Sequence, residues 1–171
     1  LGVLKKIQYS YTLFLNNLGW CLMINIDIIL LELDSYLPEY QNQISLQCIK
    51  GSPDPFYGIG RITDIDHEEK DFIEPIFEDL VYTNTIIKKL GMYRTRVMRM
   101  PPQTCYTYHR DYTQRMHIPL ITNDRCFFVI DDEVSRYPAD GSHYLINTTK
   151  RHTFVNASME HRIHIVGCVD D

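Results

Sequence analysis

The chain has 171 residues, of which 44% are hydrophobic and 23% charged, a composition that is ordinary for one globular domain. Its net charge is −5 and it contains no run of lysine or arginine. This argues against nucleic acid as a partner, because phosphate binding requires a basic surface. The five cysteines are odd in number and lack C-x-x-C spacing, which argues against a disulfide framework or a zinc knuckle and favours a reducing, cytoplasmic setting.

Residues 1–22 differ from the rest of the chain. Two lysines precede an aromatic and apolar stretch, but Asn16 and Gly19 interrupt it before it reaches the ~18 apolar residues that a membrane span needs. No small-residue cleavage site follows, and the first methionine is Met23. We therefore expect residues 1–22 to be a non-native or disordered extension, residues 23–171 to form a single domain, and no membrane to be a partner.

The first half of that domain carries helix signals and little strand signal. Capping residues, apolar spacing and turn formers decide its interpretation. In chain order we expect a helix at 27–32 capped by Asp27, a strand at 44–49, an acidic solvated loop at 64–71, and a helix at 82–90 that ends at Gly91.

After Gly91 the chain becomes rich in β-branched and aromatic residues, in short segments that turn formers separate. Strands are predicted at 93–100, 105–111, 115–122, 126–132, 143–149, 152–156 and 162–169. Many evenly spaced short strands are typical of a sandwich or barrel. The sequence thus predicts a mainly β protein, with N-terminal helices packed on an antiparallel barrel.

The segment around His109 carries the strongest candidate for a metal site. If 105–111 is a strand, His109 and Asp111 point to the same face, since alternate residues of a strand share a face. His152 begins a later strand and supplies a second imidazole. Two histidines and one carboxylate form the facial triad that holds Fe(II) and leaves three positions open. A lone H-x-D pair often forms only a mutual hydrogen bond, so the hypothesis depends on the residues around it.

Arg162 provides a candidate anion site near this triad. A hairpin centred near Ser158 would place Phe154 opposite Arg162 and His152 opposite His164. Arg162 would then lie within side-chain reach of a ligand on the metal, at about 3.3 Å per residue and 4.8 Å per strand. A planar guanidinium is the group that best binds a carboxylate through two hydrogen bonds.

Arg115 and His117 repeat this arrangement on another predicted strand, where they share one face and the apolar residues between them share the other. They would place a cation and a hydrogen-bond donor inside the barrel. In the alternative interpretation Arg115 pairs with a surface acid and His117 is a core histidine.

Together these motifs resemble the aspartyl/asparaginyl β-hydroxylase family, which includes hydroxylases of free amino acids such as proline cis-4-hydroxylase. The resemblance covers about 94–169 and rests on the ordered motifs H-x-D, R-x-H-x-P-L, and a histidine followed ten residues later by an arginine. It implies a double-stranded β-helix, a jelly-roll or cupin-like barrel, with Fe(II), 2-oxoglutarate and O2 as cofactors. The implied reaction is hydroxylation of an aliphatic C–H bond with release of succinate and CO2.

The family's functional residues map onto this chain one by one. The metal ligands match His109, Asp111 and His152. The arginine that binds the far carboxylate of 2-oxoglutarate matches Arg162, and residues that contact this cosubstrate match Arg115 and His117. The animal peptide hydroxylases lack the carboxylate ligand, so Asp111 places this chain closer to the hydroxylases of small molecules.

Two questions stay open at this level. The substrate is either a free amino acid or an Asp/Asn-type side chain of a protein, and Arg94 and Arg96 are candidates to bind its carboxylate unless they lie on a solvated barrel edge. The alternative functions are a cupin-like isomerase or dioxygenase without 2-oxoglutarate, and a non-catalytic binding barrel. Neither gives Arg162 a role.

Overall fold

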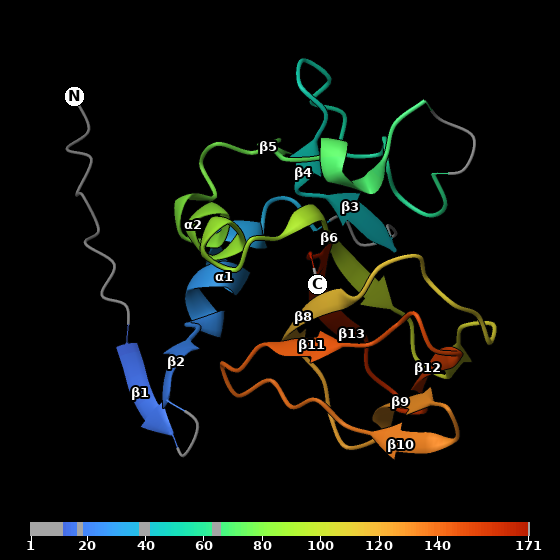
Figure 1. Cartoon of the computed structure of the whole chain (residues 1–171). Coiled ribbons are helices and arrows are strands. Elements are labelled where there is room, and N and C mark those ends of the chain that lie inside the picture. The colour runs from blue at the N-terminus through green and yellow to red at the C-terminus, as the bar shows by residue number, and fades with distance from the viewer. Residues whose placement is uncertain (1–11, 17–18, 38–41, 63–65, 171) are drawn as a thin grey trace.

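The computed structural model describes residues 12–16, 19–37, 42–62 and 66–170, with side chains from residue 22 onward (Figure 1). At its N-terminal end, β1 (Thr12–Asn16) pairs with β2 (Gly19–Met23) as an antiparallel hairpin. Residues 1–11 lie outside the described residues, and the domain boundary expected at residue 22 stays a prediction. No helix in the described residues is long and apolar enough to cross a membrane.

Two antiparallel sheets build the body of the protein (Figure 1). The larger sheet has the order β11-β8-β13-β6-β3, and the smaller sheet has the order β10-β9-β12-β7. The strands of the larger sheet are β3 (Gln43–Ser45), β6 (Tyr93–Met100), β8 (Arg115–Ile121), β11 (Tyr144–Ile146) and β13 (Arg162–Cys168). The strands of the smaller sheet are β7 (Thr104–Cys105), β9 (Cys126–Ile130), β10 (Glu133–Ser135) and β12 (His152–Asn156). From β6 to β13 the chain passes back and forth between the sheets, which is the topology of the expected double-stranded β-helix.

The outer face of the larger sheet packs against two helices. These are α1 (Ile26–Leu33) and α2 (Val81–Lys89), which lie together on one side of the sheet in Figure 1. Alternate residues of β6, β8 and β13 join buried helix residues in one apolar core, which includes Val97, Ile118, Ile163, Ile165, Ile29, Leu33 and Ile86. Burial of this apolar surface is the main force that holds helices and sheet together.

Both predicted helices are present, with one corrected cap. Asn25, not Asp27, caps α1, because its side-chain oxygen accepts a hydrogen bond from the backbone N–H of Ile28 at 3.2 Å. Glu32 of α1 accepts bonds from the first backbone N–H groups of α2, including that of Tyr82 at 2.8 Å. Gly91, at φ +62°, follows the end of α2 as expected.

Short elements complete the first half. The strand predicted at 44–49 is split into β3 and β4 (Gln47–Cys48), and β4 pairs with β5 (Glu74–Pro75). The acidic stretch 64–71 is not simply a solvated loop, because it contains the 3-10 turn η1 (Glu69–Asp71), whose Glu69 side chain is only 12% exposed. The four cysteines with described side chains are free.

The prediction of a strand over 105–111 is wrong in an informative way. β7 ends at Cys105, which pairs with Val155, yet His109 forms a bridge with His152. Residues 106–108 therefore face only residues 153–154, which leaves one extra residue on this side. Such bulges re-aim side chains beside active sites, and the two-residue period of a strand cannot reveal them.

The predicted hairpin around Ser158 is also wrong, because β12 and β13 belong to different sheets. The turn between them is a crossover that the buried Asn156 holds in place. Its Nδ2 donates to the carbonyl oxygens of Met100 at 3.1 Å and Glu160 at 2.9 Å, and its Oδ1 accepts from Ser158. The crossover turns the start of β13 back over the smaller sheet.

Candidate metal centre

The backbone brings His109, Asp111 and His152 together at one end of the barrel. His109 and His152 exchange two backbone hydrogen bonds of 3.0 and 2.8 Å, and the N–H of Asp111 donates to Thr148 at 2.9 Å. These backbone hydrogen bonds connect the segment after the bulge to β12 and to the loop that precedes β12. Convergence of the three side chains comes from this docking rather than from alternation along one strand.

The three donor groups are arranged to hold a metal ion. Their ligand atoms lie within 4.8 Å of one another, and each carboxylate oxygen of Asp111 is 3.9 Å from the Nε2 of one histidine. Nδ1 of His109 lies 2.7 Å from the carbonyl oxygen of Thr107, and Nδ1 of His152 lies 3.0 Å from that of Lys150. Because a carbonyl oxygen only accepts, both Nδ1 atoms carry the proton and both Nε2 atoms present lone pairs to the metal. The donor set fits a facial triad.

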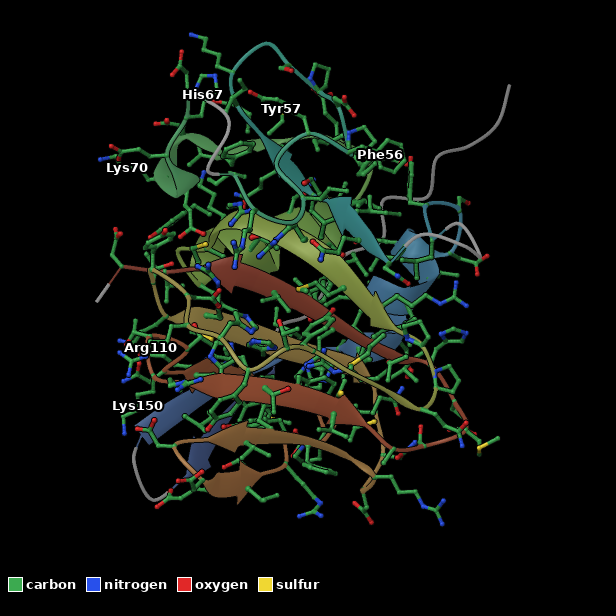
Figure 2. The ribbon with its side chains drawn as sticks, turned by 90° about the vertical axis from the view of Figure 1, so that its right-hand side faces the viewer. Phe56, Tyr57, His67, Lys70, Arg110 and Lys150 are labelled. Carbon is green, nitrogen blue, oxygen red and sulfur yellow. The ribbon has the colours of Figure 1, made fainter. Side chains whose placement is uncertain are left out.

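The centre opens into a cavity of about 1370 Å³ that lies between the two sheets. His152 is 5% exposed, whereas His109 and Asp111 are 33% and 24% exposed, so one side of the centre is accessible. In Figure 2 the side chains of Arg110 and Lys150, which neighbour the donors in the sequence, project at one edge of the molecule with Lys70 above them. The cavity exceeds the ~300–1,000 Å³ of usual ligand pockets, so it has room for two small ligands.

Arg162 lies on the wall of this cavity as a buried cation. Its guanidinium carbon is 3.7 Å from the ring centroid of Phe154 and 5.6 Å from that of Phe128. No carboxylate of the described residues lies within ion-pair distance of Arg162, and its Nε has no hydrogen-bond partner. Burial lowers the pKa of Arg162 to about 9. The proximity to Phe154 expected from the sequence is present, although it joins two sheets instead of two strands of a hairpin.

His117 and His164 lie beside Arg162 and are neutral. Arg162 donates to Nδ1 of His164, and Nδ1 of His117 lies 3.3 Å from the same nitrogen. Burial, aided by the charge of Arg162, holds the pKa of both imidazoles well below the usual value. Since Nδ1 of His164 accepts from Arg162, Nδ1 of His117 carries a proton. Contact of His117 with a cosubstrate stays a prediction.

Arg115 joins the metal centre to a buried acid that sequence reasoning missed. Its guanidinium contacts Glu69 at 2.7 Å and Asp111 at 3.3 Å. Burial would raise the pKa of Glu69, but the hydrogen bond and charge of Arg115, aided by Thr113, lower it to about 2. The sequence contains no signal that Glu69 binds Arg115, because Glu69 lies in an acidic run that is typical of a solvated loop. Arg115 therefore pairs with an acid, as in the alternative interpretation, but the acid is buried and not on the surface. Contact of Arg115 with a cosubstrate stays a prediction.

Arg94 and Arg96 both lie in the cavity wall, and neither is on a solvated barrel edge, since they are 4% and 6% exposed. They differ in how they are paired. Arg94 binds Glu69 at 2.6 Å and the carbonyl oxygens of Gly58 and Gly60, which occupies its guanidinium. Within the described part of the chain, Arg96 makes one long hydrogen bond, of 3.4 Å, to the side chain of Gln43.

Comparison with known proteins adds a family and a set of weak structural likenesses. The "Cupin 2 conserved barrel domain protein" of Salinispora arenicola is 18% identical, with a TM-score of 0.38, and 47% of this chain and 64% of that one are covered. The plu4264 protein of Photorhabdus luminescens is 17% identical, with a TM-score of 0.38 and coverages of 45% and 62%. A cupin domain of Bordetella pertussis is 16% identical, with a TM-score of 0.40 and coverages of 46% and 81%.

The chain thus spans less than two thirds of the first two of these structures. No curated protein matches its sequence. The family model described as aspartyl/asparaginyl beta-hydroxylase matches residues 67–170, which is more than half of the chain and includes both sheets except β3. The chain therefore belongs to the aspartyl/asparaginyl β-hydroxylase family.

Proposed function

We propose that this protein is an Fe(II)- and 2-oxoglutarate-dependent dioxygenase. It hydroxylates an aliphatic C–H bond of an amino acid or of an Asp/Asn-type protein side chain, with release of succinate and CO2. His109, Asp111 and His152 hold the iron, and Arg162 binds the far carboxylate of 2-oxoglutarate. Membership of the hydroxylase family and the geometry of the three donors support this assignment.

The observation that carries the proposal is the guanidinium of Arg162, which has no carboxylate partner among the described residues and lies in the same cavity as the three donors. A buried charge without a counter-ion is costly, and a bound carboxylate would offset that cost. His152 and Phe154 lie two residues apart on β12, or about 6.6 Å along the strand, and the Phe154 ring contacts Arg162. A short dicarboxylate can therefore extend from the donors to Arg162.

The chain's own residues bind and orient the reactants. Iron and 2-oxoglutarate, when bound, supply the oxidising chemistry with O2. Asp111 and the two imidazoles would hold the metal as a facial triad, which is a donor set that leaves room for further ligands. Phe128 and Phe154 are 3% and 4% exposed and exclude water around the Arg162 guanidinium, which strengthens its hydrogen bonds to a carboxylate.

The test uses anaerobic addition of Fe(II) and then of 2-oxoglutarate or 2-oxobutyrate, which lacks the far carboxylate. We expect 2-oxoglutarate to produce a weak visible charge-transfer band and to bind roughly 10- to 100-fold more tightly than 2-oxobutyrate. In Arg162→Met the two acids should bind about equally, since only the far carboxylate loses its partner. In His152→Ala no band should form.

Arg125→Met is the matched control, because Arg125 is exposed and lies away from the cavity-lining residues. It should leave the band and both affinities unchanged. If iron binds to the wild-type protein without a band, the cosubstrate assignment is wrong and a cupin-like function without 2-oxoglutarate replaces it. If iron does not bind, the protein is a binding barrel without this catalytic centre.

A further inference from the structure

His164 is a buried imidazole beside Arg162 to which the proposed function gives no role. It lies two residues after Arg162 on β13, so both side chains point to the inner face, and it is 1% exposed. Its neighbours across the sheet are Met98 of β6 and Pro119 of β8, and neither side chain is a hydrogen-bond donor. Arg162 lines the cavity, whereas His164 does not. Any role of His164 in binding is therefore exerted through a neighbouring side chain.

The hydrogen bond between these two residues fixes the protonation state of His164. A guanidinium donates and never accepts, so Nδ1 of His164 is unprotonated where it accepts from Arg162. Nδ1 of His117 lies 3.3 Å from the same atom and donates to it. The imidazole of His164 then carries its one proton on Nε2 and is neutral. Burial and the charge of Arg162 hold its pKa well below the usual value, in agreement with this state.

His164 provides the directional contact of the Arg162 guanidinium. Within the described residues it is the only group that accepts a hydrogen bond from Arg162, and Nε of Arg162 has no partner. The ring centroids of Phe154 and Phe128 lie 3.7 and 5.6 Å from the guanidinium carbon. A ring face attracts a cation but does not set the directions in which its N–H groups point. The orientation of those N–H groups therefore depends on Nδ1 of His164.

A neutral acceptor differs from a charged one in what it leaves to a ligand. A carboxylate at this position would form an ion pair with Arg162 and neutralise it, whereas an imidazole accepts a hydrogen bond and leaves the positive charge in place. The arrangement also costs stability, because the Nε2–H of His164 is buried without a hydrogen-bond partner. An apolar side chain would avoid this cost, so packing alone does not explain a histidine here.

We infer that His164 is a positioning residue, which orients the Arg162 guanidinium towards a carboxylate in the cavity and leaves its charge available for that carboxylate. This inference rests on the proposed function and adds to it a residue that does not touch the cosubstrate. His164 acts before any ligand binds, by holding the N–H groups of Arg162 in one orientation. The carboxylate then meets a guanidinium that needs no reorganisation, which increases affinity.

The experiment measures how strongly the protein prefers 2-oxoglutarate to 2-oxobutyrate, which lacks the far carboxylate. Both acids are titrated calorimetrically into protein loaded with zinc, in which no turnover occurs. His164→Leu removes the acceptor and should lower the preference about 3- to 10-fold, through weaker binding of 2-oxoglutarate alone. His164→Asn keeps an acceptor oxygen as far along the side chain as Nδ1 and should restore most of the preference. His164→Asp should lower it at least as far as His164→Leu, because its charge neutralises Arg162.

Two comparisons separate positioning from a general structural effect. In the Arg162→Met background His164→Leu should have no further effect on the preference, since residues that act as a unit are not additive. The free energy of unfolding of His164→Leu should be no lower than that of wild type, because the unpaired Nε2–H is lost with the imidazole. His143→Leu is the matched control and should leave the preference unchanged, because this half-buried histidine contacts the backbone of Leu22 and lies outside the cavity lining.

Three results would overturn the inference. One is retention of the full preference in His164→Leu, and another is a lost preference that His164→Asn fails to restore. The third is an additive loss in the double variant, which would make His164 structural. If His164→Leu does not fold, equal preferences in His164→Asn and His164→Asp overturn the inference, and a preference kept only in His164→Asn supports it.

The wild-type protein separates this inference from the proposed function. Equal binding of the two acids to wild type means that Arg162 holds no carboxylate, and the inference then falls together with the cosubstrate assignment. A wild-type preference that His164→Leu retains overturns the inference alone. A preference that depends on His164 supports it even if the Fe(II) and 2-oxoglutarate band never forms, in which case the oxygenase assignment fails and the carboxylate site stands.

Discussion

The two faces of the larger sheet have opposite chemistry although they share the same strands. The outer face presents Ile163 and Ile165 to the helices, while the inner face presents Arg162 to the cavity, with His164 hydrogen-bonded beside it. All seven residues of β13 are buried, so burial alone does not distinguish the faces. The outer face is explained by packing within the chain. The inner face fits the proposed function, in which ligands complete it.

The unsatisfied nitrogens within the strands of the larger sheet show the same contrast, although the buried Oγ1 of Thr95 on the outer face also lacks a partner. Among the described residues, the buried nitrogens without partners include Nε of Arg96, Nε of Arg162 and Nε2 of His164. Each of these lies on the inner face, where an unpaired buried polar group costs free energy of folding. The comparison therefore predicts that outer-face substitutions reduce stability and spare binding, whereas inner-face substitutions do the reverse.

The largest effect on stability is expected from Ile165→Ala on the outer face. Ile165 is fully buried in the core between sheet and helices, and its truncation leaves a cavity. The free energy of unfolding should fall by about 3 kcal/mol in a denaturant titration. The Fe(II) affinity of the folded protein should stay within about twofold of the wild-type value, because the side chain points away from the donors. A large loss of iron affinity at full folding would break the distinction between the faces.

Glu69→Gln tests the link between scaffold and metal centre. The carboxylate holds Arg94 at 2.6 Å and Arg115 at 2.7 Å, and Arg115 contacts Asp111, the candidate metal ligand. Removal of its charge should lower the free energy of unfolding by about 2 kcal/mol. It should also weaken Fe(II) binding several-fold, because Arg115 then pairs more strongly with Asp111. Glu68→Gln is the control, since that neighbouring carboxylate is 72% exposed.

The same residue predicts an acid dependence of stability. The pKa of Glu69 is lowered in the folded protein to about 2 from a model-peptide value of 4.5. The unfolded chain therefore binds a proton that the folded chain does not, and the stabilisation is present above pH 4.5 and is lost as the pH falls towards 2. Unfolding titrations of metal-free protein over this range should show a steeper loss for wild type than for Glu69→Gln. Parallel pH profiles would contradict the lowered pKa.

The sequence alone was sufficient to predict those elements and residues that local or periodic patterns define. The bounds of β6 and β12 were predicted to the residue, because alternating side chains and turn formers mark them. The three metal-ligand candidates also lie together as expected. The bulge before His109 and the crossover near Ser158 were missed, because both depend on pairing between distant strands. Glu69 was missed for the same reason, since its two arginine partners lie 25 and 46 residues away along the chain.

The smallest expected effect on stability, and the one of opposite sign, is that of Arg162→Met. Methionine has a similar length, keeps contact with Phe128 and Phe154, and removes a buried charge that no carboxylate of the described residues neutralises. Without ligands the variant should be about 1 kcal/mol more stable than wild type in a denaturant titration, since replacing a buried charge by a packed apolar side chain is often stabilising. Addition of zinc and 2-oxoglutarate should reverse the order, because only wild type gains the binding free energy of the far carboxylate. If Arg162→Met is destabilised by several kcal/mol without ligand, Arg162 belongs to the scaffold, and the inner face of the sheet is not reserved for ligands.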